Sequence, residues 1–311
     1  MSNILVVGSL NLDMVVKTPV IPRVGETVLG YEVKYIPGGK GANQAVAAAR
    51  LGASTVMLGA IGNDDNGRVI RESLDGAGAD TSRLRVVPDA VSGLALICVE
   101  DAGNNNIVVI PGTNNDCTCE YLKENDDRFS WCDVIMLQME IPFESTLQAA
   151  RWGRELGKIV MANIAPVPPH GCDGLYPLCD YISVNESELE KLTGSAVDSI
   201  DEILAACDLI RGRGVKNVLV TLGSRGALLH NAQGHVMLAP PDVKVVDTTA
   251  AGDTFTAAFM LEMCHTGDIE SAIAYANAAA SLAVSRMGAQ SSIPDADEVR
   301  RFMQKHEAIY V

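Results

Sequence analysis

The chain has 311 residues, long enough for one large α/β domain whose core needs no disulfides. Hydrophobic residues make up 48% and aromatic residues 5%, a composition typical of an ordinary soluble enzyme. Its net charge of −15 argues against binding to the phosphate backbone of nucleic acids. No basic leader precedes the first apolar run, and no uncharged apolar run reaches the roughly 18 residues of a membrane span, so we expect a cytoplasmic protein without membrane contact.

The first predicted strand is the apolar run over residues 4–7, which Gly8 closes. Asn11 and Asp13 follow it closely. Polar groups beyond the carboxyl end of a buried strand are where open α/β sheets bind ligands, although Asn and Asp also favour ordinary turns. The sequence leaves both interpretations open at this point.

Two β-prone segments interrupt the early part of the chain. The first covers about 11–37 and is broken by prolines, and the second covers about 91–111. Within the second, Asp101–Asn104 separates two apolar runs, which predicts a hairpin. We predict that the two segments pair into one small β sheet that forms a lid over a ligand site.

The stretch Gly38–Asn43 leads into an Ala-rich helix predicted over 44–51. Its glycines allow a ligand to approach the backbone, while Lys40 and Asn43 offer donors. The stretch is not a Walker A loop, because Gly41 follows Lys40 where Ser or Thr would be required. The chain also lacks the G-x-G-x-x-G fingerprint of dinucleotide-binding proteins.

The remainder of the chain alternates between strands and helices. Strands are predicted at 55–61, 133–138, 158–163, 181–184 and 217–222, and helices near 143–156, 199–212, 269–284 and 295–305. Repeated strand–helix units predict one α/β domain over 1–311, with a mostly parallel central sheet and helices on both faces.

The stretch Asp247–Thr254 joins a polar turn to an apolar helix that we expect to begin near Asp253. Ala250, Ala251 and Gly252 are small enough to let an anion reach the unpaired N–H groups of the helix start. Asp253 is either the cap of this helix or a general base beside a phosphoryl-binding site.

Several of these polar groups fall just beyond predicted strands or at helix starts, which is the ligand-binding edge of such a sheet. Moreover, Gly38–Ala45 and Asp247–Thr254 resemble the two signature regions of the ribokinases, within the phosphofructokinase-B class of carbohydrate kinases. The resemblance extends along nearly the whole chain. It implies a ribokinase-like three-layer fold with a small β-sheet lid.

The resemblance also implies roles for individual residues. Asp253 would be the catalytic base, and the N–H groups around Ala250, Ala251 and Gly252 would hold the migrating phosphoryl group. The implied sugar-binding positions are Asn11, Leu12, Asp13, Gly39, Lys40, Gly41, Ala42, Asn43, Glu140 and Asp253. The implied ATP-binding positions are Asn185, Glu188, Thr221, Leu222, Gly223, Ser224, Arg225, Gly226, Gly252, Asp253 and Asn277.

Two metal ions are implied as well. Glu188 would help to hold Mg²⁺ through water. A monovalent cation, expected to be K⁺, would be held mostly by backbone oxygens of Asp247, Thr249, Ala283, Arg286, Gly288 and Ser292.

The implied activity is ATP-dependent phosphorylation of D-ribose at its 5-hydroxyl, in a homodimer formed through the lid. Deoxyribose, another pentose, a hexose or a nucleoside remain possible substrates. A catalytically silent sugar-binding regulatory protein on the same fold is the alternative from another class.

Overall fold

The computed structural model describes residues 2–306, so the domain expected over 1–311 extends beyond the described residues at both ends. Its centre is an eight-stranded sheet in the order β14-β13-β12-β11-β10-β9-β1-β4. The strands are β1 (Asn3–Val7), β4 (Ser54–Leu58), β9 (Val134–Leu137), β10 (Ile159–Asn163), β11 (Tyr181–Asn185), β12 (Asn217–Thr221), β13 (Ala227–Asn231) and β14 (Gly234–Leu238). Neighbouring strands from β4 to β12 pair in parallel. At the other edge, β13 pairs antiparallel with both β12 and β14.

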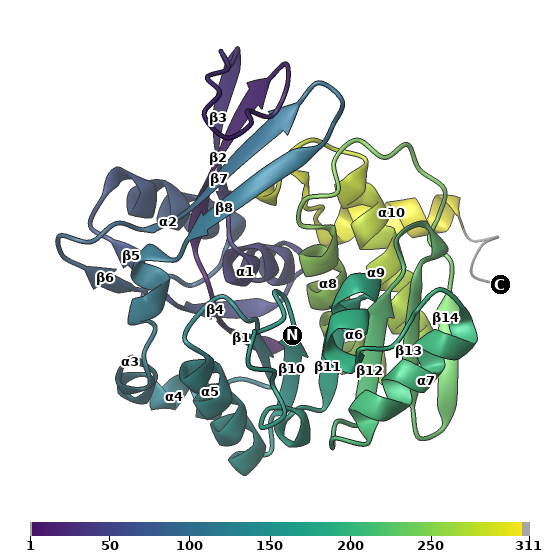
Figure 1. Cartoon of the computed structure of the whole chain (residues 1–311). Coiled ribbons are helices and arrows are strands. Elements are labelled where there is room, and N and C mark those ends of the chain that lie inside the picture. The colour runs from purple at the N-terminus through teal and green to yellow at the C-terminus, as the bar shows by residue number, and fades with distance from the viewer. Residues whose placement is uncertain (1, 307–311) are drawn as a thin grey trace.

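Helices cover both faces of this sheet (Figure 1). One face packs against α1 (Lys40–Arg50), α2 (Asp65–Ala77), α8 (Ala251–Thr266), α9 (Ile269–Val284) and α10 (Ala296–Lys305). The other packs against α3 (Cys119–Glu124), α4 (Asp126–Trp131), α5 (Phe143–Glu155), α6 (Glu186–Thr193) and α7 (Ile200–Arg211).

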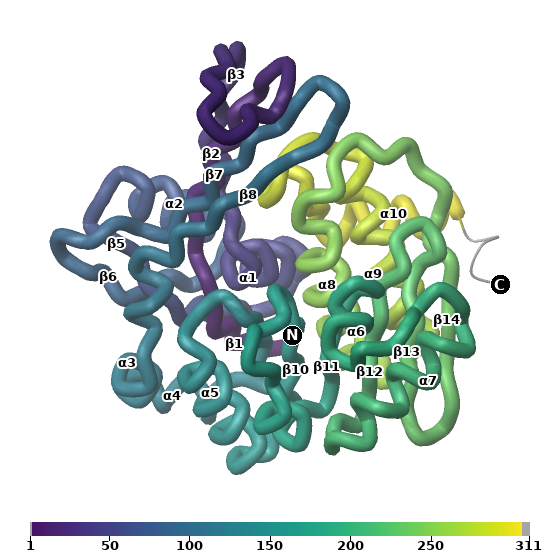
Figure 2. The backbone as a smooth tube through the Cα atoms, in the orientation of Figure 1, coloured from purple at the N-terminus to yellow at the C-terminus, as the bar shows by residue number. Residues whose placement is uncertain are grey.

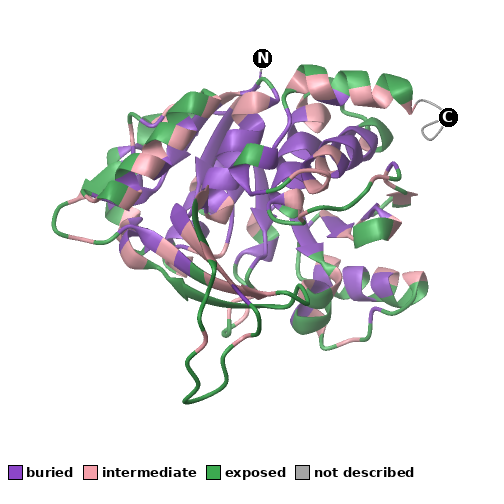
Figure 3. Cartoon of the chain, turned by 90° about the horizontal axis from the view of Figure 1, so that it is seen from above, coloured by how far each residue is buried: buried purple, intermediate pink, exposed green. Residues whose placement is uncertain are grey.

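The side chains of β1 point alternately to the two faces of the sheet and contribute to a hydrophobic core on each face. Ile4 and Val6 belong to the core on the α1 and α8 side, whereas Leu5 and Val7 belong to the opposite core. Successive side chains of a strand point to opposite faces, so a run of four apolar residues serves both layers. Figure 3 shows that the buried residues gather in the central sheet and in the helix faces packed on it.

A second, four-stranded sheet has the order β3-β2-β7-β8 and projects from the body (Figure 1). Its strands are β2 (Asn11–Thr18), β3 (Glu32–Gly38), β7 (Gly93–Glu100) and β8 (Asn105–Ile110). The two β-prone segments of the sequence therefore do pair, because β2 lies parallel to β7 with Asn11 opposite Gly93. The backbone passes from the body into this sheet and back twice, as Figure 2 shows.

Smaller elements complete the fold. Strands β5 (Ala60–Gly62) and β6 (Arg85–Val87) form a two-stranded sheet. Short 3-10 helices cover Gly112–Asp116, Tyr176–Leu178, Gly223–Arg225 and Gln290–Ser292. Among residues 2–306, no helix has both the length and the apolar character needed to cross a membrane.

The predicted elements match most of these bounds, with some differences. The single strand predicted over 55–61 is wrong, because it is divided between β4 in the main sheet and β5 in the small sheet. Gly59 joins the two, and a Cβ there would lie 2.7 Å from the Gly8 carbonyl oxygen. The sequence patterns also did not predict α3, α4 and α6 or the antiparallel strands β13 and β14.

Candidate active site

Helix α8 begins at Ala251 and has Asp253 in its first turn, but this aspartate does not cap the helix. The N-cap is Ala250, which has left-handed backbone angles (φ 60°, ψ 8°), and no side chain caps this end. The Asp253 carboxylate accepts instead from Asn43 Nδ2 at 2.9 Å and from Gln44 Nε2 at 3.1 Å, both on α1. The capping interpretation is therefore wrong, and the carboxylate faces across to α1.

The start of α8 leaves backbone donors available. The N–H of Ala251, one of the expected phosphoryl-binding donors, already donates to Thr248 O at 3.2 Å. Within residues 2–306, the N–H groups of Gly252 and Asp253 have no backbone acceptor. These two groups lie at the positive end of a 16-residue helix, which is where an anion is stabilised.

A polar cavity of about 240 Å³ lies in front of this helix start. Lys40, Glu188 and Asp253 line it together with Gly252, which is exposed. Its full lining is Lys40, Asn163, Ala165, Ser183, Val184, Asn185, Glu188, Thr221, Thr248, Ala250, Gly252 and Asp253. The structure therefore places the predicted base, the predicted lysine and the Asn185–Glu188 pair around one space.

Asp13 and Glu140 join this group of charges. Burial, reinforced by the negative charges of Glu140 and Asp253, raises the pKa of Asp13 to about 7. Burial by itself would lower the pKa of Lys40, but Asp253, Glu140 and Glu188 outweigh it and keep that pKa above its usual value. A partly buried ammonium near three carboxylates is well suited to bind a ligand that is both hydroxylated and phosphorylated.

Ser9 fixes the expected sugar-binding loop. Its hydroxyl donates to Glu140 Oε2 and accepts from the Gly41 N–H at 3.3 Å, and its carbonyl accepts from the Ala42 N–H at 2.9 Å. Glu140 Oε2 also accepts from the Lys40 N–H at 3.1 Å. A Cβ on Gly41 would lie 2.6 Å from the Ser9 nitrogen, so this position has no room for a side chain.

Asn11 is held by a residue that no sequence motif indicated. Asn114 Nδ2 donates to Asn11 Oδ1 at 2.7 Å, and Asn114 Oδ1 accepts from the Leu10 N–H at 2.8 Å. The neighbouring Leu12 is buried, and Gly39 adopts a positive φ of 86° as the chain turns into α1. A lone asparagine 103 positions from its partner carries no motif, so only the folded chain reveals this contact.

A larger cavity of about 560 Å³ also reaches the start of α8. Five of the expected nucleotide-binding residues line it together with Gly252, namely Thr221, Gly223, Ser224, Gly226 and Asn277. Ala251, an expected phosphoryl-binding residue, and Thr248 of the Asp247–Thr254 stretch also line it. The rest of the lining, which the sequence patterns did not indicate, is Pro240, Pro241, Asp242, Val243, Val245, Phe255, Ala280, Ser281 and Val284. Leu222 is buried and Arg225 pairs with Glu186, so neither of these expected residues lines the cavity.

Asn185 and Glu188 form a capping box at the start of α6. Asn185 Oδ1 accepts from the Glu188 N–H, and Glu188 Oε2 accepts from the Asn185 N–H, each at 2.8 Å. Burial raises the pKa of Glu188. Among residues 2–306, no group of three or more His, Cys, Asp or Glu side chains is arranged to hold a metal ion. Glu188 is one carboxylate lining the smaller cavity, and Mg²⁺ commonly uses one or two protein carboxylates and keeps several waters.

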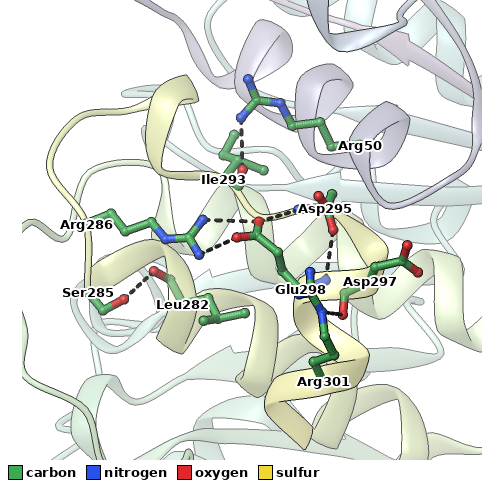
Figure 4. A network of polar contacts seen from close by, with 9 residues as sticks. All are labelled: Arg50, Leu282, Ser285, Arg286, Ile293, Asp295, Asp297, Glu298 and Arg301. Atoms are coloured by element: carbon green, nitrogen blue, oxygen red, sulfur yellow. Dashed lines mark hydrogen bonds and ion pairs between the residues drawn. The ribbon is translucent and has the colours of Figure 1, made fainter.

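The residues expected around the monovalent cation lie in the segment before α8, at the end of α9 and in the segment that follows α9. Asp247 accepts from Thr249 N and Oγ1 and from the Gly288 N–H, and these hydrogen bonds outweigh its burial and hold its pKa below the usual value. Arg286 is paired with Glu298 through both carboxylate oxygens, and Arg50 anchors the same loop at Ile293 O (Figure 4). The side chains thus fix the loop, and backbone oxygens remain as the candidate ligands.

The sequence profile of the pfkB family carbohydrate kinases matches residues 1–296 of the chain. The chain belongs to this family. It is 36% identical to a ribokinase of Bacillus subtilis over 303 residues, which cover 97% of this chain and 100% of that protein. It is 34% identical to a deoxyribokinase of Salmonella typhi over 305 residues, which cover 98% and 100%.

The fold of this pfkB kinase is also similar to that of a solved ribokinase structure. The structure of Arabidopsis thaliana ribokinase complexed with ribose and ATP superposes with a TM-score of 0.90 at 34% identity, covering 97% of this chain and 99% of that one. The expected ribokinase-like α/β fold is thereby confirmed. The expectation that the chain is a carbohydrate kinase is confirmed as well.

Proposed function

We propose that this kinase transfers the γ-phosphoryl group of ATP to the 5-hydroxyl of D-ribose. The observation that carries this proposal is the position of Gly252 and Asp253. Gly252 lines both cavities, and Asp253 lines the smaller one together with Lys40. A nucleotide in the larger cavity and a sugar beside Asp253 would therefore meet at the start of α8. The relatives of this chain include a bacterial ribokinase by sequence and a plant ribokinase by structure.

In the proposed mechanism, the Asp253 carboxylate takes the proton of the sugar hydroxyl as that oxygen attacks the γ-phosphorus. The new O–P bond forms while the bond to the β-phosphate oxygen breaks, and ADP leaves. The N–H groups of Gly252 and Asp253 and the ammonium of Lys40 stabilise the charge on the transferring oxygens. Magnesium bound near Glu188 would add positive charge between the phosphates.

The sugar would be oriented by the groups that the structure gathers from β2, α1 and Glu140. Asn43 Oδ1 is buried without a partner among the described residues, because the amide nitrogen is turned toward Asp253. Such an acceptor is suited to a sugar hydroxyl, since an unsatisfied buried oxygen is costly. Carboxylates of Asp13 and Glu140 would accept from further hydroxyls.

A deoxyribokinase function is the second candidate. The identity to a deoxyribokinase, 34%, is close to the 36% shared with a ribokinase, so overall similarity does not discriminate between the two sugars. The discrimination must come from the few side chains near the sugar C2 atom. We favour ribose because Asn11 and Asp13 offer paired hydrogen bonds for vicinal hydroxyls.

We also propose that two copies associate through the four-stranded sheet. All six residues of β8 are exposed, and large apolar side chains gather on this sheet at Val33, Tyr35, Leu96, Ile107, Val108, Val109 and Ile110. Exposed apolar strands at a sheet edge tend to be covered by another chain.

The eight free cysteines suit a reducing compartment, so we propose that the enzyme works in the cytoplasm.

An ADP-release assay with ATP and a panel of pentoses, hexoses, deoxyribose and nucleosides tests this proposal. We expect ribose to give the highest kcat/KM, and Asp253→Asn to lower kcat by roughly 10²- to 10⁴-fold. Highest activity with deoxyribose would replace the ribose assignment. No activity with any acceptor, together with sugar binding in calorimetry, would favour the silent binding protein instead.

A further inference from the structure

A chain of buried amides ends on Asp253. Gln138 Nε2 donates to Gln44 Oε1 at 2.6 Å, and Gln44 Nε2 donates to Asp253 Oδ1 at 3.1 Å. Gln44 lies on α1, whereas Gln138 directly follows β9. Both glutamines are 0% exposed. Neither lines the two cavities described above, so they do not touch the space where substrates would bind.

The direction of this chain follows from the chemistry of its end. An ionised carboxylate only accepts hydrogen bonds, so the Gln44 amide must turn its nitrogen toward Asp253. Its oxygen then faces Gln138, which must donate in turn. Without the Gln138 donor, the Gln44 amide could rotate and present its oxygen to the carboxylate, which would repel it.

The surrounding structure makes room for Gln138. A Cβ on Gly8 would meet the side chain of Gln138, so the glycine that closes β1 leaves the space this amide fills. Gln138 Oε1 has no partner among the described residues. An unsatisfied buried oxygen costs stability, so the favourable polar contact of this side chain is the hydrogen bond from its Nε2 to Gln44.

We propose that Gln44 and Gln138 are positioning residues that set the orientation of Asp253 for proton abstraction. This inference rests on the proposed kinase function. Asn43 donates to Asp253 Oδ2 and Gln44 to Oδ1, so the carboxylate is held at both oxygens and cannot rotate freely. Asn43 is one of the expected sugar-binding residues, whereas Gln44 and Gln138 would act only through Asp253.

Replacing either glutamine leaves the charged groups around Asp253 in place. Lys40 on α1, Asp13 on β2 and Glu188 on α6 all interact with the Asp253 charge. A change in the pH dependence of kcat between the native protein and a Gln44 variant therefore reports on the lost donor. Removing a donor from the anionic carboxylate favours its protonated form, which moves the acid limb of kcat to higher pH.

The test compares Gln44→Leu, Gln138→Leu and the double variant with the native enzyme, using the sugar and ATP that support its activity. We expect Gln44→Leu to lower kcat roughly ten- to hundredfold, to leave the KM for the sugar within about twofold, and to move the acid limb of kcat up by about one pH unit. Gln138→Leu should give a smaller change of the same kind. Because both act through one carboxylate, the double variant should be no slower than Gln44→Leu.

Asn125→Leu is the matched control, since it removes another buried amide, one that bonds to Tyr121 O away from the site. It should lower thermal stability without moving the pH profile. Losses of kcat in the glutamine variants that come with an unchanged pH profile would overturn the inference and leave a structural role. An inactive native enzyme would refute the proposed function instead, so the two failures are distinguishable.

Discussion

Asn43 and Asp253 lie 210 positions apart in the sequence, and Asn43 Nδ2 donates to Asp253 Oδ2 at 2.9 Å. The contact joins the first turns of α1 and α8, which pack against each other. The two stretches that resemble family signatures in the sequence therefore lie in contact in space. Each part of this site can be altered separately, so its contribution can be measured.

Gly252→Ala should slow the reaction without harming the fold. A Cβ on Gly252 would meet no other atom within 4 Å, and alanine favours a helix over glycine by up to about 1 kcal/mol. However, Gly252 lines both cavities, so the methyl group would stand where the phosphoryl group approaches the backbone. We expect kcat to fall at least roughly tenfold while the melting temperature stays level or rises.

Gly76→Ala is the control for this experiment. Gly76 lies within α2, and a Cβ there also has no neighbour within 4 Å. It should give the same change in stability with native kcat. Equal activities of the two alanine variants would show that the α8 start does not bind the phosphoryl group.

Glu188→Gln should separate the capping role of Glu188 from its charge. The glutamine oxygen can still accept from the Asn185 N–H, as Glu188 does at 2.8 Å, so the free energy of unfolding should change by less than about 0.5 kcal/mol. The lost charge should raise the magnesium concentration needed for half-maximal activity about tenfold. A magnesium titration of the rate measures this, with Glu188→Ala as the variant that loses both roles. An unchanged titration would assign Glu188 to the helix cap alone.

Asp13→Asn should stabilise the protein at alkaline pH. The pKa of Asp13 rises from 3.8 to about 7 on folding, so between these values the folded protein holds a proton that the unfolded chain has released. The contribution of Asp13 to the free energy of unfolding therefore falls as the pH rises through this window. Asparagine does not titrate, so its free energy of unfolding lacks this loss. The stability of the variant relative to the native protein should therefore increase by on the order of 3 kcal/mol as the pH rises from about 4 to about 8.

Urea unfolding of both proteins at the two pH values measures this difference. A stability difference that does not change with pH would show that Asp13 is not the group responsible. Activity of Asp13→Asn should fall nevertheless, since the carboxylate is proposed to accept from the sugar hydroxyls.

Potassium should activate the enzyme more than sodium. The loops that contain Asp247 and Gly288 are joined by a 2.9 Å hydrogen bond, and the Asp247 backbone precedes the α8 start by a few residues. A cation held there would order the backbone that presents the N–H groups to the phosphate. Rates measured in potassium and in sodium at equal ionic strength test this, and identical rates would contradict it. Asp247→Ala should remove the difference between the two salts.

The sequence predicted the parts of the fold that depend on local patterns. Buried strands such as Ile4–Val7 and long Ala-rich helices are recognisable by their composition, and their alternation predicts the parallel sheet. The antiparallel strands β13 and β14 were missed because Ala227–Leu238 follows a glycine-rich turn without a clear alternation. Helix α6 was missed because its first residues were interpreted only as a ligand-binding motif.

Within the site, the sequence identified residues in motifs and missed those that support them. Asn114 and Gln138 belong to no motif, and Gln44 lies within Gly38–Ala45 but was assigned no role. Their partners lie up to 209 positions away. The apolar wall formed by Pro241, Val243 and Val245 belongs to a segment without regular structure. Such contacts arise only when distant segments pack, so no local pattern encodes them.

The distance along the chain between α1 and α8 also matters while the protein is being made. A ribosome synthesises Asn43 and Gln44 long before Asp253, the residue to which they will donate. The nascent chain can fold its first strands early, yet it has no base to activate a sugar until the start of α8 has emerged. We therefore expect incomplete chains to hydrolyse or transfer no ATP, so that only finished copies consume it.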